Sequence, residues 1–79
     1  MLWRFPMPNL DPKQALTDLE EEAILPNPVQ VRDMIFRTHL ESDQLLQANR
    51  KLKEYLKAYG SCQELARSIL TILAGAPQK

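Results

Sequence analysis

The sequence predicts an all-α protein of three helices, in which a long central helix lies between two short ones. Three observations indicate this fold class. Helix-start signals recur along the chain, apolar residues repeat at three- and four-residue spacing, and only 2 of the 79 residues are glycine. Scarce glycine suits helices and does not suit a β architecture with many turns. We expect helices over residues 12–25, 28–59 and 62–74.

The first expected helix begins after Asp11. This residue can cap the first turn, Pro12 suits the first helical position, and Gln14 completes a capping box. Pro26 disfavours helical geometry at the residue before it, so we expect the helix to end at Leu25.

The central helix is expected to run from residue 28 to residue 59. Asn27 and Pro28 repeat the start signal, and Gly60 suits the left-handed position after a helix. Apolar residues off the main stripe, Val29, Phe36 and Leu40, form a second row. The main stripe has heptad spacing and consists of Val31, Ile35, Thr38, Ser42, Leu45, Asn49, Leu52, Leu56 and Tyr59.

Polar residues within this stripe leave two interpretations open. In the first, Thr38, Ser42 and Asn49 lie in the interface and penalise wrong registers of an assembly. In the second, Thr38 and Ser42 face solvent. A bend or break of the helix near residues 41–43 is a further possibility.

The third helix follows a capping box of the S-x-x-E form at Ser61 to Glu64, and Gly75 suits its end. The short links between the helices indicate tight reversals rather than flexible linkers. We therefore expect an extended arm over residues 1–10, a single helical domain over residues 11–75, and a frayed tail over residues 76–79.

The length of the central helix predicts self-association. At ~1.5 Å per residue it would extend for about 48 Å, more than an antiparallel hairpin with two short helices covers. We expect a homo-oligomer formed by coiled-coil-like helix packing; the alternative is a compact monomeric three-helix bundle. The expected interface consists of Val31, Ile35, Leu45, Asn49, Leu52, Leu56, Tyr59, Leu65, Ile69 and Ile72.

Two further segments are candidates for binding a partner. Trp3, Phe5 and Met7 alternate along the arm, and large apolar groups of this kind anchor interfaces. The alternative is that they cover the protein's own core. A basic run late in the central helix offers Arg50, Lys53 and Lys57, and an acidic run over residues 18–22 offers a complement in another protomer. Both runs are equally compatible with solvated helix surface.

Chemistry at a catalytic, metal or cofactor site is not expected. His39 is the only histidine and lacks neighbouring ligands, so we interpret it as a surface residue. Cys62 is the only cysteine, which excludes an internal disulfide, and it fits an apolar helix face. We find no phosphate loop and no nucleophile with its base, and therefore expect neither a cofactor nor enzyme activity.

Composition narrows the classes of partner. The formal net charge is zero, whereas proteins that bind phosphate backbones usually carry a basic excess. No stretch approaches the ~18 apolar residues of a membrane span, and residues 1–8 do not form a signal peptide because Arg4 and two prolines interrupt them. We expect a cytoplasmic protein.

The expected function is that of a non-enzymatic protein–protein interaction module, a small helical homo-oligomer acting as regulator, adaptor or assembly factor. The first alternative is a dimeric nucleic-acid-binding regulator that uses the basic run of the central helix. The second is a helical co-chaperone of a secretion or assembly system. The expected layout is similar to that of small bacterial helical-hairpin proteins such as secretion co-chaperones and regulatory connectors, a similarity of architecture that assigns no residue a role.

Overall fold

The structure, a computed structural model, describes residues 11–58 and 63–79. Over these residues the chain forms four helices and no strand, which confirms the all-α class: α1 (Pro12–Glu22), α2 (Pro28–Phe36), α3 (Ser42–Lys57) and α4 (Gln63–Ala74). The predictions for the arm with Trp3, Phe5 and Met7, for Tyr59, and for the cap at Ser61 and Cys62 lie outside the described residues.

Helix α1 begins where the sequence predicts and ends earlier. The Asp11 carboxylate accepts a hydrogen bond from the backbone N–H of Gln14 at 3.4 Å. The helix stops at Glu22 rather than at Leu25, because Ala23 adopts a left-handed conformation with φ 55°. The last turn carries acidic residues and no basic one, and negative charge at a helix C-terminus opposes the helix dipole. Extending α1 beyond Glu22 would therefore add little stability.

Helix α2 begins with the predicted capping box. The side-chain oxygen of Asn27 accepts from the backbone N–H of Val29 at 2.7 Å, and the Asn27 N–H donates to the Gln30 side chain at 3.0 Å. Pro28 occupies the first turn, where its missing N–H costs nothing. The start signal read from the sequence is confirmed at this position.

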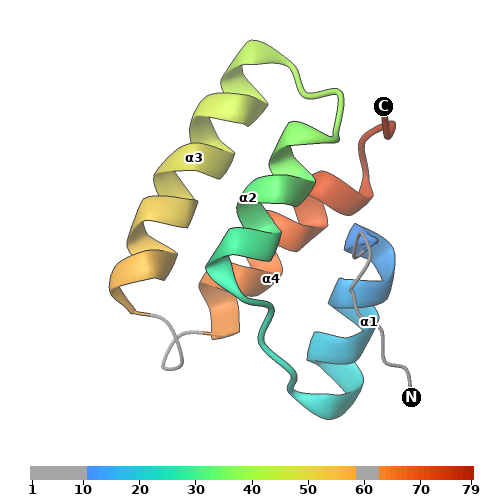
Figure 1. The fold of residues 1–79 in the computed structure, drawn as a ribbon, viewed down its shortest axis with the longest axis vertical. Coiled ribbons are helices and arrows are strands. Elements are labelled where there is room, and N and C mark those ends of the chain that lie inside the picture. Colours follow the sequence, from blue (N-terminus) through green and yellow to red (C-terminus); the bar gives the residue numbers. More distant parts are fainter. Residues whose placement is uncertain (1–10, 59–62) are drawn as a thin grey trace, which may run out of the picture.

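The prediction of one helix over residues 28–59 is wrong, because residues 37–41 separate α2 from α3. The buried Thr38 hydroxyl donates to the Met34 carbonyl at 2.7 Å and so takes part in the end of α2. A new helix start follows, in which the backbone N–H of Glu41 donates to the side chain of Gln44 at 3.0 Å. The expected long rod is therefore an antiparallel hairpin of two shorter helices (Figure 1).

The last residues of the sequence, expected to fray, pair with the segment between α2 and α3. The His39 N–H donates to the Pro77 carbonyl, and the Lys79 N–H donates to the Arg37 carbonyl, both at 2.8 Å. Thr38 and Gln78 lie opposite one another in an antiparallel bridge. The segment over residues 37–39 is thus held by backbone hydrogen bonds from residues far away in the sequence.

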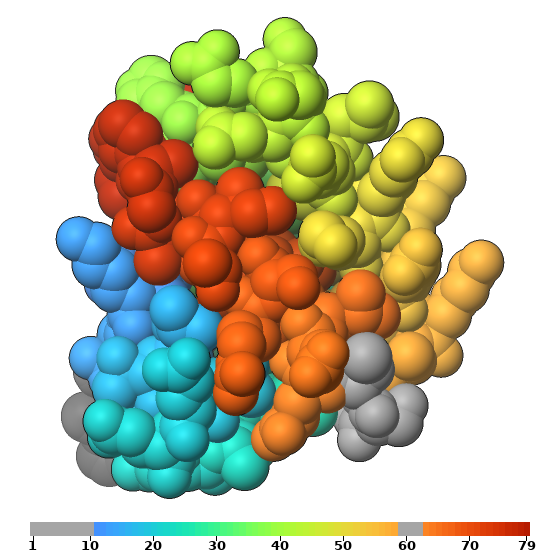
Figure 2. Space-filling model, turned by 180° about the vertical axis from the view of Figure 1, so that it is seen from behind, coloured from blue at the N-terminus to red at the C-terminus, as the bar shows by residue number. Residues whose placement is uncertain are grey.

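Helix α4 is central to the packing. In Figure 1 it lies behind α2, and Figure 2 shows it from the other side between α1 and α3. The first helix therefore packs on α4, not along a central rod as expected. All four helices contribute to one core of twelve buried apolar residues: Ala15, Leu19, Val31, Met34, Ile35, Ala48, Leu52, Tyr55, Ala66, Ile69, Leu70 and Leu73.

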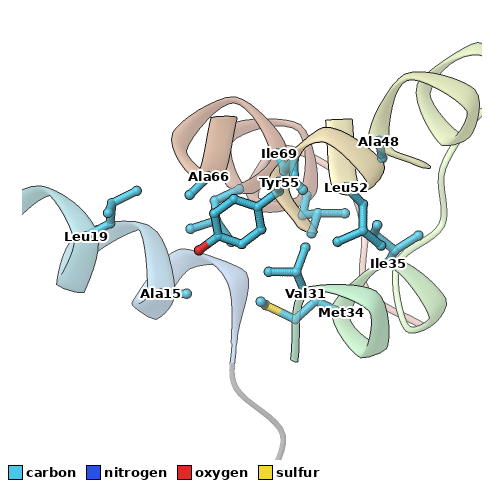
Figure 3. Packing of buried hydrophobic residues seen from close by; sticks show 12 residues of the cluster. Ala15, Leu19, Val31, Met34, Ile35, Ala48, Leu52, Tyr55, Ala66 and Ile69 are labelled. Atoms are coloured by element: carbon cyan, nitrogen blue, oxygen red, sulfur yellow. The ribbon is translucent and has the colours of Figure 1, made fainter. Parts of the chain in front are cut away.

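Tyr55 connects this core to the link between α1 and α2. Its ring is fully buried among the apolar side chains (Figure 3). Its hydroxyl donates to the backbone carbonyl of Pro26 at 2.7 Å, so the buried phenol has a partner. The contact holds α3 to the chain reversal that precedes α2.

Candidate protein-binding site

The large apolar residues that the fold leaves exposed are concentrated on α2 and α3. Val29 and Phe36 on α2 are 64% and 71% exposed. Leu45, Leu46 and Leu56 on α3 are 41%, 59% and 59% exposed. Scattered apolar residues on a surface are ordinary, whereas a group on two neighbouring helices marks a candidate interaction surface.

Helical spacing explains how these residues share a side of each helix. On α2, steps of three and four residues place one row beside the buried residues Val31 and Ile35. On α3, a row with the same kind of spacing lies beside the buried Ala48 and Leu52. We call the two rows together the α2–α3 face, which consists of Val29, Arg32, Phe36, Leu45, Asn49 and Leu56.

One end of the α2–α3 face is hollowed into a cavity of about 540 Å³, which lies within the usual size range of ligand pockets. Residues of α2, of α3 and of the segment between them contribute to its wall. Its apolar lining consists of Ile35, Phe36, Leu40 and Leu45. The break between the two helices makes this cavity, because it lets Phe36 of α2 and Leu45 of α3 line the same hollow.

The polar lining of the cavity is basic. Arg32, His39 and Lys79 contribute to it together with the neutral Thr38 and Asn49, and no acidic side chain does. The nearest carboxylate along α2, that of Asp33, forms an ion pair with Arg37 at 2.9 Å. The cavity therefore combines an apolar wall with the cationic side chains of Arg32 and Lys79, and none of its lining side chains is acidic.

The residues of the expected basic run are exposed on α3. Arg50, Lys53 and Lys57 follow Leu46 and Asn49 along the solvent side of the helix, beside the α2–α3 face. They extend positive charge from the cavity towards the C-terminal end of α3.

The acidic run lies on α1 and its three glutamates are exposed. Glu20 lies 3.8 Å from Arg67 of α4, an exposed ion pair within one chain. Exposed ion pairs contribute about 0–1 kcal/mol to stability. This weak pair does not prevent the acidic run from pairing with other charges. Pairing between the acidic run of one protomer and the basic run of another stays a prediction.

The structure divides the expected oligomer interface. Val31, Ile35, Leu52 and Ile69 are buried in the core of a single chain, and Leu65 and Ile72 are half-buried. Leu45, Asn49 and Leu56 are exposed together on one side of α3. Only these last three are fully available to a partner in this fold, because the stripe was derived for an unbroken helix.

The sequence did not assign Arg32, Phe36 or Lys79 to a site. The available signal was the second apolar row of Val29, Phe36 and Leu40, whose first two members are among the exposed apolar residues. Lys79 carries no local signal, because its place at the cavity depends on backbone pairing with residues 37–39.

The part of the chain that the structure describes contains no set of metal ligands. His39 is exposed, and no group of three or more His, Cys, Asp and Glu residues could hold a metal ion there. Within the same residues, no helix is both long and apolar enough to cross a bilayer. Comparisons with protein-family models, with curated proteins and with solved structures found no match for this chain.

Proposed function

We propose that this protein is a non-enzymatic protein-binding module and that the α2–α3 face receives its partner. The observation that carries the proposal is the exposure of Val29, Phe36, Leu45 and Leu56 on two neighbouring helices, with Phe36 and Leu45 lining a cavity between them. Covering apolar surface of this kind favours association, and aromatic residues such as Phe36 anchor interfaces.

A second copy of the chain is the second candidate partner. It is supported by Leu45, Asn49 and Leu56, which were expected in an oligomer interface and are exposed on one side of α3. Pairing two α2–α3 faces directly would bring Arg32 and the other basic groups of both copies together, which is unfavourable. A self-associated form therefore needs a different arrangement, such as this face against the acidic run of α1.

The test of the proposal is a selection of peptides from a displayed random library on the immobilised protein. We expect enrichment of amphipathic sequences that bind at least about tenfold more weakly to Phe36→Ser, because a buried Phe contributes on the order of 1.5–3 kcal/mol. Phe36 is largely exposed, so its replacement should leave the fold intact.

Ile24→Ser is the matched control, since Ile24 is also an exposed apolar residue and lies outside the α2–α3 face. Selected peptides should bind this variant as they bind the original protein. Absence of enrichment, or equal loss of binding in both variants, would overturn the proposal.

A further inference from the structure

We infer that the partner presents an acidic amphipathic helix, whose apolar side chains enter the cavity and whose carboxylates meet Arg32 and Lys79. This inference rests on the proposed function and adds the chemistry and conformation of the partner. It follows from the charge of the cavity, from the hydrogen bonding of the segment that closes it, and from the arrangement of the two helices that form it.

Charge selects the chemistry of the partner. Arg32 and Lys79 line the cavity, no lining side chain is acidic, and Arg50, Lys53 and Lys57 are exposed further along α3. A partner with carboxylates beside its apolar residues supplies opposite charge where apolar burial takes place. Complementary charges of this kind contribute mainly to the specificity and the rate of association.

Backbone pairing selects the conformation of the partner. The segment around Thr38 lies beside the cavity in an antiparallel bridge, and its His39 N–H and Arg37 C=O are already bonded to residues 77 and 79. Strand addition needs free backbone groups on such a segment. A helix instead brings an apolar row to the cavity and needs no backbone partner.

The apolar lining favours this partner over a nucleic acid. A duplex would use the cations of α3 and leave Phe36, Leu45 and Leu56 exposed at its edge. An acidic amphipathic helix covers these residues and pairs with the cations in the same contact. The zero net charge of the chain also provides no long-range attraction for a polyanion.

The experiment uses two synthetic peptides with the same spacing of leucines on one helical face. One carries glutamate and the other lysine on both sides of the leucine row, and fluorescence anisotropy measures the affinity of each for the full chain. We expect the glutamate peptide to bind about tenfold or more tightly than the lysine peptide at low salt, and the difference to shrink at high salt.

Charge reversal locates the contact. Arg32→Glu should weaken the glutamate peptide about tenfold and strengthen the lysine peptide, because it replaces an attraction by a repulsion. Lys13→Glu makes the same change in net charge on the exposed side of α1 and should leave both affinities unchanged. Phe36→Ser should weaken both peptides, since it removes apolar contact rather than charge.

The possible outcomes separate this inference from the proposed function. Equal affinity for the two peptides, with loss in Phe36→Ser, overturns the acidic partner and leaves the protein-binding module in place. A DNA duplex that displaces the glutamate peptide, with binding insensitive to Phe36→Ser, overturns both. Light scattering that shows a dimer dissociated by Phe36→Ser assigns the face to a second copy and overturns the separate partner.

Discussion

Helix α3 carries two adjacent rows of side chains in opposite environments, a buried side and an exposed side. On one side, Leu52 is 7% exposed and Tyr55 is fully buried against the other helices. On the other side, Leu56 is 59% exposed beside Asn49 on the α2–α3 face. Residues four apart are neighbours on a helix, so the boundary between the buried and the exposed side passes between Leu52 and Leu56. Leu52 stabilises the fold, whereas Leu56 is exposed to a partner.

The heptad stripe read from the sequence mixes these two sides. It joins Val31 and Ile35, which are buried on α2, to Leu45 and Leu56, which are exposed on α3. The stripe assumed one continuous helix, and the non-helical residues 37–41 change the phase between the two halves. On α3 the buried row is instead Ala48, Leu52 and Tyr55.

The largest expected effect is a contrast between two substitutions on α3. Leu52→Asp should unfold the protein, because it places an uncompensated charge in the core and removes apolar burial, which together exceed the ~5 kcal/mol stability of a small domain. Leu56→Asp should change the free energy of unfolding by about 0.5 kcal/mol or less, as is usual for surface changes. Thermal unfolding followed by circular dichroism measures both.

Unfolding of both variants would break the comparison between the two sides of α3. It would mean that Leu56 is covered in the stable form of the protein, and therefore that a second copy lies against the α2–α3 face. Light scattering of the original chain across a dilution series gives the mass needed to distinguish these cases.

Removing residues 77–79 tests what holds the two halves of the hairpin in place. The deletion eliminates two backbone hydrogen bonds of 2.8 Å to the segment between α2 and α3. At about 0.5–1.5 kcal/mol each, we expect a loss of about 1–3 kcal/mol in unfolding by urea. An unchanged midpoint would show that the break between α2 and α3 is maintained without this pairing.

Tyr55→Phe tests the core side of α3 without changing its shape. The substitution removes the buried hydrogen bond to the Pro26 carbonyl, and an unsatisfied buried group costs about 1–2 kcal/mol. For a domain of this size a loss of 1 kcal/mol lowers Tm by about 4–8 °C. Peptide binding at the α2–α3 face should stay as it was, and reduced affinity would show that the two sides are coupled.

Local signals in the sequence predicted local structure well. The caps at Asp11 and Asn27 depend on residues within three positions of each other, and both side chains accept a backbone N–H as expected. The capping box is complete at Asn27, whereas the Gln14 side chain donates to Asp18. The end of α2 depends on a contact that local patterns do not contain, since Thr38 pairs with Gln78 forty residues away. Between Pro28 and Lys57 the chain has neither glycine nor another proline. No local signal for the end of α2 was therefore as strong as the start signals at Asp11 and Asn27.

The candidate site could not be predicted for the same reason. Its apolar residues were visible as a second row that includes Phe36 and Leu40, yet a continuous helix would keep Phe36 and Leu45 on one rod rather than across a cavity. Arg32 and Lys79 meet at the cavity only after the hairpin forms and residues 77–79 pair with it. The site is thus a consequence of the tertiary fold.

The smallest expected effect is a gain in stability from Ala23→Gly. Ala23 ends α1 with φ 55°, a conformation that costs a non-glycine residue about 1–2 kcal/mol and costs glycine almost nothing. Glycine also makes the unfolded chain more flexible, which offsets about 0.4–1 kcal/mol of this benefit. We therefore expect a net gain of about 0.5–1 kcal/mol in urea unfolding.

Ala58→Gly is the matched control, because Ala58 ends α3 with φ −114° and gains nothing from left-handed freedom. It should lose up to about 1 kcal/mol, since only the entropic cost of glycine remains. Ala23 belongs to the link that receives the Tyr55 hydroxyl, so its replacement should strengthen the core side of the molecule and leave peptide affinity unchanged. If Ala23→Gly and Ala58→Gly destabilise equally, Ala23 does not hold the left-handed conformation in solution, and the early end of α1 has another cause.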